Sequence, residues 1–347
     1  MKIGFIGRQG AGRSTLFAAM TGREILPGAA AGGKTRLGIA RVTDERVDRL
    51  TDLCKPRRTV YAEVVLSLPP AAATAVVDIA ALRETRDLKA LAHVVGAFAP
   101  PPGESAEQVA LAQMAELTTE LILADLERVE TRQARIGKGG GARVREDELL
   151  ARARACLEAE RVLRLESWDE QLTSLMDELG LTSHRPLITV INVAEDALRG
   201  GCPEAVARAA ATVVSEPMWL CATLEAEIAA LQPQEQQEFL AAYDLERPVS
   251  QRFVQTAFTL LQQICFFTVG PDEVRAWPIA RQTNARRAAR TIHSDLERGF
   301  IRAEVVSYEV LLVHGSEARC KAVGVMRTEG KDYEVQDGDV ITVRFNV

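Results

Sequence analysis

A glycine-rich segment near the N-terminus has the residue types that can wrap a phosphate group. Residues 7–15 read Gly-Arg-Gln-Gly-Ala-Gly-Arg-Ser-Thr. Glycines let consecutive backbone N–H groups curl round an anion, and a following helix adds the positive end of its dipole. The spacing matches the loop G-x-x-x-x-G-K-[ST], except that an arginine stands at the lysine position. We therefore predict a nucleotide phosphate site made by Gly7, Gly10, Ala11, Gly12, Arg13, Ser14 and Thr15.

Two residues of this loop decide how the phosphates would be held. Arg13 keeps the positive charge of the usual lysine, but its planar fork is longer and bulkier, so we expect retained but weaker binding. The Ser14 hydroxyl is expected to ligate Mg²⁺ delivered with ATP or GTP. A strand-to-helix turn that uses glycine only for its geometry is the structural alternative.

The elements around this loop predict an α/β domain. Residues 2–6 form an apolar run typical of a buried strand, and residues 14–20 after the loop have the composition of a helix. This strand, loop and helix order opens many α/β nucleotide-binding domains. Further strand-like runs are expected at 63–68, 93–98 and 187–193.

A helical insertion is expected between the strand-like runs at 93–98 and 187–193. Apolar residues recur every three to five positions over about 105–136, and a similar apolar pattern is present over 145–179. The tip, 137–141, reads Gly-Lys-Gly-Gly-Gly and cannot sustain a helix. We predict two long helices folded back as a coiled-coil-like hairpin. Two separate surface helices are the alternative.

The last 75 or so residues change character again. Short β-rich runs are predicted at 305–313, 321–325 and 340–345, with Gly-Lys-Asp and Asp-Gly-Asp turn signals between them. They indicate a small, strand-rich α+β domain at the C-terminal end.

Composition narrows the classes of protein. The chain has 347 residues and a net charge of −6, which argues against a uniformly basic nucleic-acid binder. Its six cysteines form no C-x-x-C pair, so reduced thiols are expected. No apolar run approaches the roughly 18–20 residues of a membrane span. We expect a cytoplasmic protein with no membrane partner.

Several stretches resemble the YchF/Obg-like ATPase family over nearly the whole chain. The residues that carry the resemblance are Glu273–Trp277, Ile292–Val305, Glu329–Tyr333, Val335–Val340 and Arg344–Val347, together with Arg83-Glu84-Thr85 and His93-Val94-Val95. The first five look like the family's terminal TGS-type domain. The resemblance implies a discontinuous P-loop G-domain (1–104 and 180–268), a helical hairpin (105–179) and a TGS-like domain (269–347).

The resemblance also implies base recognition that favours ATP over GTP. Family members carry N-x-x-E where GTPases carry N-K-x-D, and Asn192-Val193-Ala194-Glu195 follows the apolar strand at the expected place. Asn192, Val193 and Glu195 are therefore expected on the adenine side. Cys221, Ala222 and Thr223 resemble the last base-contacting loop. For Asn192–Glu195, the alternative is a polar strand end that does not contact a base.

Departures from the family pattern concern the groups that act on Mg²⁺ and the γ-phosphate. The D-x-x-G segment corresponds to 65–69, with leucine and proline at the motif positions. A second register through Asp78 restores an aspartate but not the glycine, and the first is preferred because Arg83–Thr85 would place Asp78 within the following helix. The segment 70–81 is alanine-rich and shorter. Gly10 replaces an asparagine that could position a monovalent cation, and Thr35 is off register as the switch threonine.

Losing such groups should lower the rate of phosphoryl transfer by orders of magnitude. We expect ATP binding with weak or lost hydrolysis in a regulator that meets ribosomes or RNA through the hairpin and the TGS-like domain. No catalytic residue can be assigned. The basic cluster Arg281, Arg286, Arg287 and Arg290 could meet phosphate backbone, or could be a solvated helix face. An active ATPase and a nucleotide-independent scaffold are the competing functions.

Overall fold

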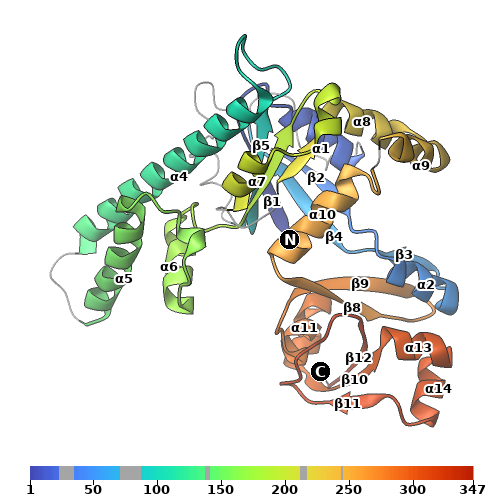
Figure 1. Cartoon of the computed structure of the whole chain (residues 1–347). Coiled ribbons are helices and arrows are strands. Elements are labelled where there is room, and N and C mark those ends of the chain that lie inside the picture. Colours follow the sequence, from blue (N-terminus) through green and yellow to red (C-terminus); the bar gives the residue numbers. More distant parts are fainter. Residues whose placement is uncertain (23–34, 71–86, 137–140, 212–216, 244, 347) are drawn as a thin grey trace. The chain divides into compact units, whose positions relative to one another are not determined.

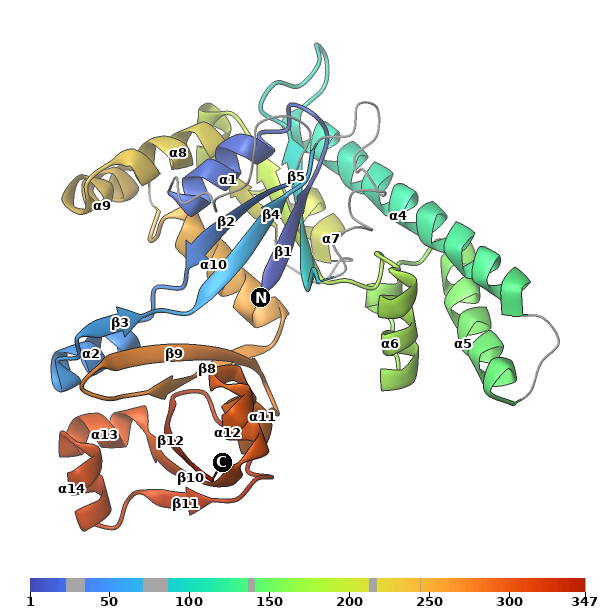
Figure 2. The same ribbon diagram turned by 180° about the vertical axis from the view of Figure 1, so that it is seen from behind.

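The computed structural model describes residues 1–22, 35–70, 87–136, 141–211, 217–243 and 245–346. These residues form two compact units. The first comprises Met1–Ala40 and Val64–Ala257, and the second comprises Arg41–Glu63 and Phe258–Val347 (Figures 1 and 2).

A six-stranded sheet of order β2-β4-β1-β5-β6-β7 forms the centre of the first unit. The ladder from β4 to β7 is parallel throughout. Its central strands are buried along nearly their whole length, as expected for a parallel sheet covered on both faces. The strands are β1 (Lys2–Ile6), β2 (Arg36–Arg41), β4 (Glu63–Leu68), β5 (Ala90–Gly96), β6 (Leu187–Asn192) and β7 (Met218–Leu220).

Helices cover both faces of this sheet, and adjacent residues of β1 show which helix lies where. Phe5 meets Phe17 of α1 and stacks on Phe253 of α10, with ring centroids 6.2 and 5.5 Å away. Ile6 points to the opposite face and joins the cluster formed with α4 and α7. The helices of this unit are α1 (Arg13–Thr21), α4 (Ala106–Ile136), α5 (Gly141–Glu158), α6 (Glu170–Leu179), α7 (Glu204–Ala211), α8 (Ala222–Ala230), α9 (Pro233–Ala242) and α10 (Val249–Leu260), with 3-10 turns at Leu163–Leu165 and Glu195–Gly200.

The first arm of the helical insertion is a single long helix, α4, which starts one residue after the predicted position. The second arm, predicted as one helix over 145–179, is divided. Helix α5 stops at Glu158 because Glu160 turns left-handed (φ 57°), and α6 starts afresh where Asp169 accepts from the Leu172 N–H at 2.8 Å. Helices α4 and α5 pack together through an apolar cluster that includes Val129 and Leu150 (Figure 1).

The second unit contains a six-stranded sheet of order β11-β10-β12-β8-β9-β3. Pairs β8–β9, β10–β11 and β10–β12 are antiparallel, whereas β8–β12 and β3–β9 are parallel. Its elements are α2 (Glu45–Cys54), β3 (Arg58–Val60), β8 (Gln263–Thr268), β9 (Glu273–Ala280), α11 (Ala285–Ile292), α12 (Ser294–Arg298), β10 (Phe300–Ser307), α13 (Tyr308–His314), α14 (Glu317–Ala322), β11 (Arg327–Glu329) and β12 (Asp339–Phe345).

One strand predicted in this unit is confirmed only at its start, and another is wrong in type. The run 305–313 is a strand only as far as Ser307, whose hydroxyl then caps α13 by accepting from the Val310 N–H at 3.4 Å. The run 321–325 contains the end of α14, which Ser316 caps in the same way. A short apolar run does not by itself distinguish strand from helix, and the capping serines decide here.

The boundaries of the second unit also differ from the predicted ones. Residues 41–63 and 258–268, assigned from sequence to the first domain, lie with the second unit. Strand β3 pairs with β9, and Arg46 of α2 donates to Asp337 at 2.8 Å. These contacts join parts of the chain some 200 to 290 residues apart. Among the described residues, no helix is both long and apolar enough to cross a bilayer.

Candidate functional site

The glycine-rich segment forms the turn between β1 and α1. Gly7, Gly10 and Gly12 all have positive φ, at 141°, 83° and 91°. A Cβ on Gly7 would lie 2.2 Å from the Val94 carbonyl oxygen, and one on Gly12 would lie 2.3 Å from Asn192 Nδ2. Gly10 has nothing within 4 Å of the same position. The turn therefore needs glycine for its backbone angles at three places and for space at two of them.

Asn192 anchors this loop to the far side of the site. It is the last residue of β6 and is 5% exposed. Its Nδ2 donates to the Ala11 carbonyl at 3.0 Å, and its Oδ1 accepts from the Ala222 N–H at 2.8 Å. One side chain thus joins the glycine-rich turn to the start of α8. The structure therefore brings together Ala11 of the glycine-rich turn, Asn192 of the N-x-x-E motif and Ala222 of the predicted last base-contacting loop.

Gln113 of α4 holds the end of β5, against which the glycine-rich turn packs. Its amide both donates to the Gly96 carbonyl (3.0 Å) and accepts from the Gly96 N–H (3.2 Å). A Cβ on Gly96 would lie 2.8 Å from the Ala11 Cα. Glycine at the end of β5 therefore lets the loop backbone approach closely, and Gln113 fixes that strand end.

The remaining residues predicted to contact the base follow β6 and β7. Glu195 is exposed, and its Oε1 accepts from the Tyr243 hydroxyl at 2.6 Å, which raises the pKa of Tyr243. Val193 is buried, and its N–H donates to the Leu220 carbonyl at 2.8 Å. Cys221 Sγ lies 3.1 Å from the Thr223 hydroxyl at the start of α8. Asn192, Glu195 and Cys221–Thr223 thus lie at the carboxyl ends of two adjacent parallel strands, where ligands bind in open α/β sheets.

The two arginines near the loop do not have carboxylate partners among the described residues. Arg13 is 9% exposed, and its Nη1 reaches the Pro69 carbonyl at 3.5 Å. Burial, and then the charge of Arg36, lower the pKa of Arg13. Arg36 donates from Nη2 to the Ser14 hydroxyl at 2.8 Å. In contrast, Arg8 in the same loop pairs with Glu116.

The end of β4 carries no acid. The strand ends at Leu68, and buried Leu66 and buried Pro69 stand at the aspartate and glycine positions predicted for the D-x-x-G motif. Asp78 and the Arg83–Thr85 landmark lie outside the described residues. Thr35 lies directly before β2.

Three supporting residues were not predicted from the sequence. Gln113, Tyr243 and Arg36 reach the site from positions that no local motif marks. For Gln113, a polar residue on the apolar stripe of α4 is the one signal available, because a buried amide needs partners.

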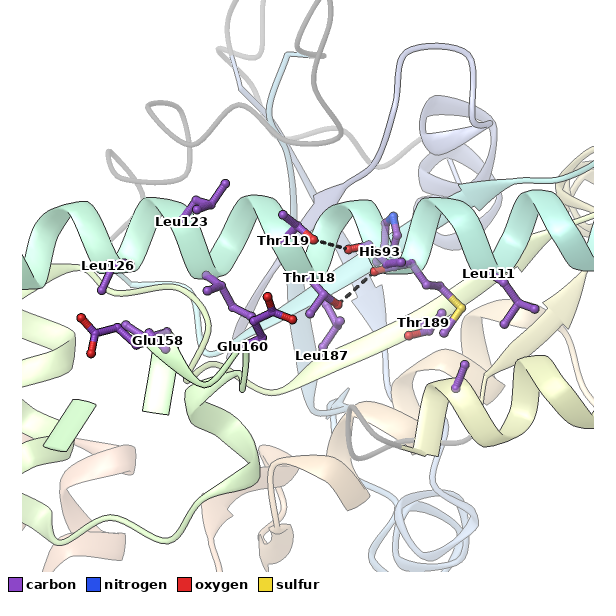
Figure 3. Close-up of a pocket in the computed structure, with 15 residues that line it drawn as sticks. His93, Leu111, Thr118, Thr119, Leu123, Leu126, Glu158, Glu160, Leu187 and Thr189 are labelled. Carbon is purple, nitrogen blue, oxygen red and sulfur yellow. Dashed lines mark hydrogen bonds between the residues drawn. The ribbon is translucent and has the colours of Figure 1, made fainter. Parts of the chain in front are cut away.

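A separate cavity of about 750 Å³ lies in the first unit between α4, the end of α5 and strands β5 and β6 (Figure 3). Most of its lining is apolar, and two acids, Glu158 and Glu160, also contribute. His93, on its floor, is neutral because burial, and then the charge of Arg164, lower its pKa to about 3. The lining residues that the structure describes include no lysine or arginine, so this cavity does not suit a polyphosphate.

His93 should make the stability of the first unit depend on pH. In the unfolded chain it binds a proton below about pH 6.5, and in the folded chain only near pH 3. The unfolded state therefore binds one more proton between these values, so stability falls as pH falls through 6.5, by about 1.4 kcal/mol per pH unit at most. Urea unfolding of wild type and His93→Gln between pH 7.5 and 5 measures this. The difference between the two proteins should be constant above pH 7 and change below it. Parallel curves throughout would contradict the assignment.

Comparison with known proteins identifies the chain's relatives. The family model YchF-GTPase_C, described as a protein of unknown function (DUF933), matches residues 263–346. A protein of Bacillus subtilis (strain 168) named "Ribosome-binding ATPase YchF" is 35% identical, covering 100% of both chains. One of the same name from Haemophilus influenzae is 32% identical, covering 100% of this chain and 99% of the relative.

A solved structure agrees at the level of the fold. The "Structure of the Schizosaccharomyces pombe YchF GTPase" superposes with a TM-score of 0.84 at 23% identity, covering 99% of this chain and 97% of the other. The resemblance predicted from the sequence is confirmed, and the α/β first unit is consistent with a P-loop G-domain. Full-length identity above 30%, the match of the C-terminal residues and this shared fold together show that the chain belongs to the YchF family.

Proposed function

We propose that this chain is a P-loop nucleotide-binding protein that prefers ATP, hydrolyses it slowly or not at all, and acts with the ribosome. One observation carries the binding part. Three positive-φ glycines and the two hydrogen bonds of Asn192 hold the segment after β1 in a fixed turn at the start of α1. Such a turn presents backbone N–H groups and a helix N-terminus to a phosphate. Gly7, Gly10, Ala11, Gly12, Arg13, Ser14 and Thr15 would form this cradle.

The preference for ATP rests on the base side. Asn192 and Glu195 stand in the family's N-x-x-E pattern, with Val193 between them and Cys221–Thr223 opposite. The hydroxyl of Tyr243 holds one oxygen of the Glu195 carboxylate at 2.6 Å and leaves the other for an exocyclic amine of adenine. An exocyclic amine donates to a carboxylate. Guanine also carries such donors, so the N-x-x-E pattern is the ground for preferring adenine.

Slow hydrolysis follows from the groups near the γ-phosphate position. Buried Leu66 of β4 and buried Pro69, directly after β4, stand where the family pattern has an aspartate and a glycine. Magnesium with ATP or GTP is the cofactor that the family implies, and in the family pattern Ser14 would ligate it; in this chain Arg36 already donates to that hydroxyl. An active ATPase remains the competing enzyme function if Asp78 supplies the missing acid. A scaffold with a dead nucleotide site is the other alternative.

Association with the ribosome, and hence a cytoplasmic location, is supported by the names of the Bacillus and Haemophilus relatives. The proposed domains are a G-domain (1–104 and 180–268), a coiled-coil-like helical hairpin (105–179) and a TGS-like domain (269–347). The hairpin and the TGS-like domain are the proposed contact surfaces for the ribosome. Arg281, Arg286, Arg287 and Arg290 are exposed on and beside α11, whose alanines face the core. Such a basic face suits the phosphate backbone of RNA.

Two measurements on the full chain test this function. Phosphate release with ATP should stay at the level of a Ser14→Ala control, whereas clear turnover above that control would favour the active ATPase. Co-sedimentation with purified ribosomes should weaken about tenfold in Arg287→Glu, since charge reversal opposes phosphate contact. Arg208→Glu, at an exposed arginine of the first unit, is the matched control. No sedimentation of wild type with or without ATP would contradict the ribosomal role.

A further inference from the structure

Arg36 donates a hydrogen bond to the Ser14 hydroxyl, the group that ligates a metal ion in the usual P-loop. It is the first residue of β2, and its Nη2 donates to Ser14 Oγ at 2.8 Å. Its guanidinium also lies over the ring of Phe17, with Cζ 5.7 Å from the centroid. Ser14 and Phe17 are one turn apart on α1, so two contacts fix the side chain against that helix.

The described residues around Ser14 do not fit a magnesium ion. Mg²⁺ requires oxygen ligands in near-octahedral geometry, and P-loop proteins supply the Ser or Thr hydroxyl together with an aspartate. Here the hydroxyl oxygen already accepts from a cation, which would repel a second one. Leu66 of β4 and Pro69 after it stand at the two D-x-x-G positions and are not acids. No cluster of three metal-binding side chains occurs in the parts of the chain that the structure describes.

The positive charges of Arg13 and Arg36 suit a polyphosphate that carries no metal ion. Arg13 and Arg36 influence each other electrostatically, and within the described chain neither forms an ion pair with a carboxylate. Keeping two cations close together, one of them buried, costs free energy that a bound anion would offset. A guanidinium can donate two parallel hydrogen bonds to phosphate oxygens, so it can neutralise as well as orient them.

We propose that Arg36 replaces the magnesium ion, so that this chain binds nucleotide with its phosphates metal-free. This inference rests on the proposed nucleotide binding and says how the phosphates would be neutralised there. Arg36 and Arg13 are the groups that contact the phosphates. Excess Mg²⁺ then competes with the protein for the nucleotide and does not assist binding.

Calorimetric titration of ATP and ADP into the full chain, once in excess EDTA and once in excess MgCl₂, tests this directly. Wild type should bind in EDTA at least as tightly as in MgCl₂. Arg36→Met keeps a long unbranched side chain but loses the guanidinium and its charge. It should bind about tenfold or more weakly in EDTA, because a charge-assisted contact is lost. Arg36→Lys should lie between the two. Arg208→Met, at an exposed arginine elsewhere in the first unit, should match wild type.

The outcomes separate the inference from the function on which it depends. Binding by wild type in MgCl₂ but not in EDTA would overturn the role of Arg36 and leave nucleotide binding intact. Equal metal-free affinity of Arg36→Met and wild type would also overturn it. Absence of binding under both conditions would refute the nucleotide site itself. Thermal unfolding of each nucleotide-free variant shows that a lost affinity is not lost folding.

Discussion

Gly12→Ala should weaken nucleotide binding by about 100-fold or more, whereas Gly10→Ala should weaken it only severalfold. Both glycines have positive φ, so both substitutions carry a similar backbone cost of roughly 1–3 kcal/mol. The added methyl differs in what it meets. At position 12 it would lie 2.3 Å from Asn192 Nδ2, and at position 10 it meets nothing within 4 Å. The clash at Gly12 must move either the loop or its anchor, and displaced amides lose several charge-assisted hydrogen bonds to phosphate.

This pair of variants separates conformational strain from the shape of the site. Calorimetry with ATP gives the affinities, and thermal unfolding without nucleotide gives the cost to the fold. Gly10→Ala and Gly12→Ala should both melt below wild type, with the second lower. If Gly12→Ala bound ATP as tightly as Gly10→Ala does, the turn after β1 would not be the phosphate cradle.

Asn192→Ala should lower the free energy of unfolding by about 2–5 kcal/mol. The substitution removes two buried hydrogen bonds and leaves the Ala11 carbonyl and the Ala222 N–H without partners, at roughly 1–3 kcal/mol each. It also frees the loop from α8, so nucleotide affinity should fall with stability. Urea unfolding measures the first effect and calorimetry the second.

Asn192→Asp distinguishes the two bonds of this residue. A carboxylate still accepts from the Ala222 N–H but can no longer donate to the Ala11 carbonyl, and it sets a negative charge beside the phosphate position. We therefore expect ATP affinity to fall further in Asn192→Asp than in Asn192→Ala. A loss of stability below about 0.5 kcal/mol in Asn192→Ala would show that the side chain does not carry the anchor, because surface substitutions have effects of that size.

Local patterns were enough to predict the first strand, the loop and the first helix. The glycine spacing, the apolar run before it and the helix formers after it all indicate the same structure, and β1 and α1 lie where expected. Strand β4 was predicted with the bounds that the structure has, and β5 within a few residues. The long first arm, α4, followed from its apolar periodicity because a helix that packs along its length keeps that pattern.

Contacts between distant segments could not be predicted in this way. Residues 41–63 join the second unit through β3 and Arg46, and only the pairing with β9 and Asp337 reveals it. The segment 305–313 holds a strand and a helix whose residues are equally apolar, so a single serine cap decides the boundary. Arg36 and Tyr243 reach the site from outside every motif, because side-chain direction depends on the packed fold.

Hydrogen exchange of the full chain, with and without saturating ATP, tests the central claim most directly. Binding in the turn after β1 predicts slower exchange in peptides that cover residues 7–15, and also 192–195 and 221–223, with no change around His93. Gly12→Ala should show none of this protection. Unchanged exchange in residues 7–15 of the wild-type chain at saturating ATP, ADP and GTP would contradict the account.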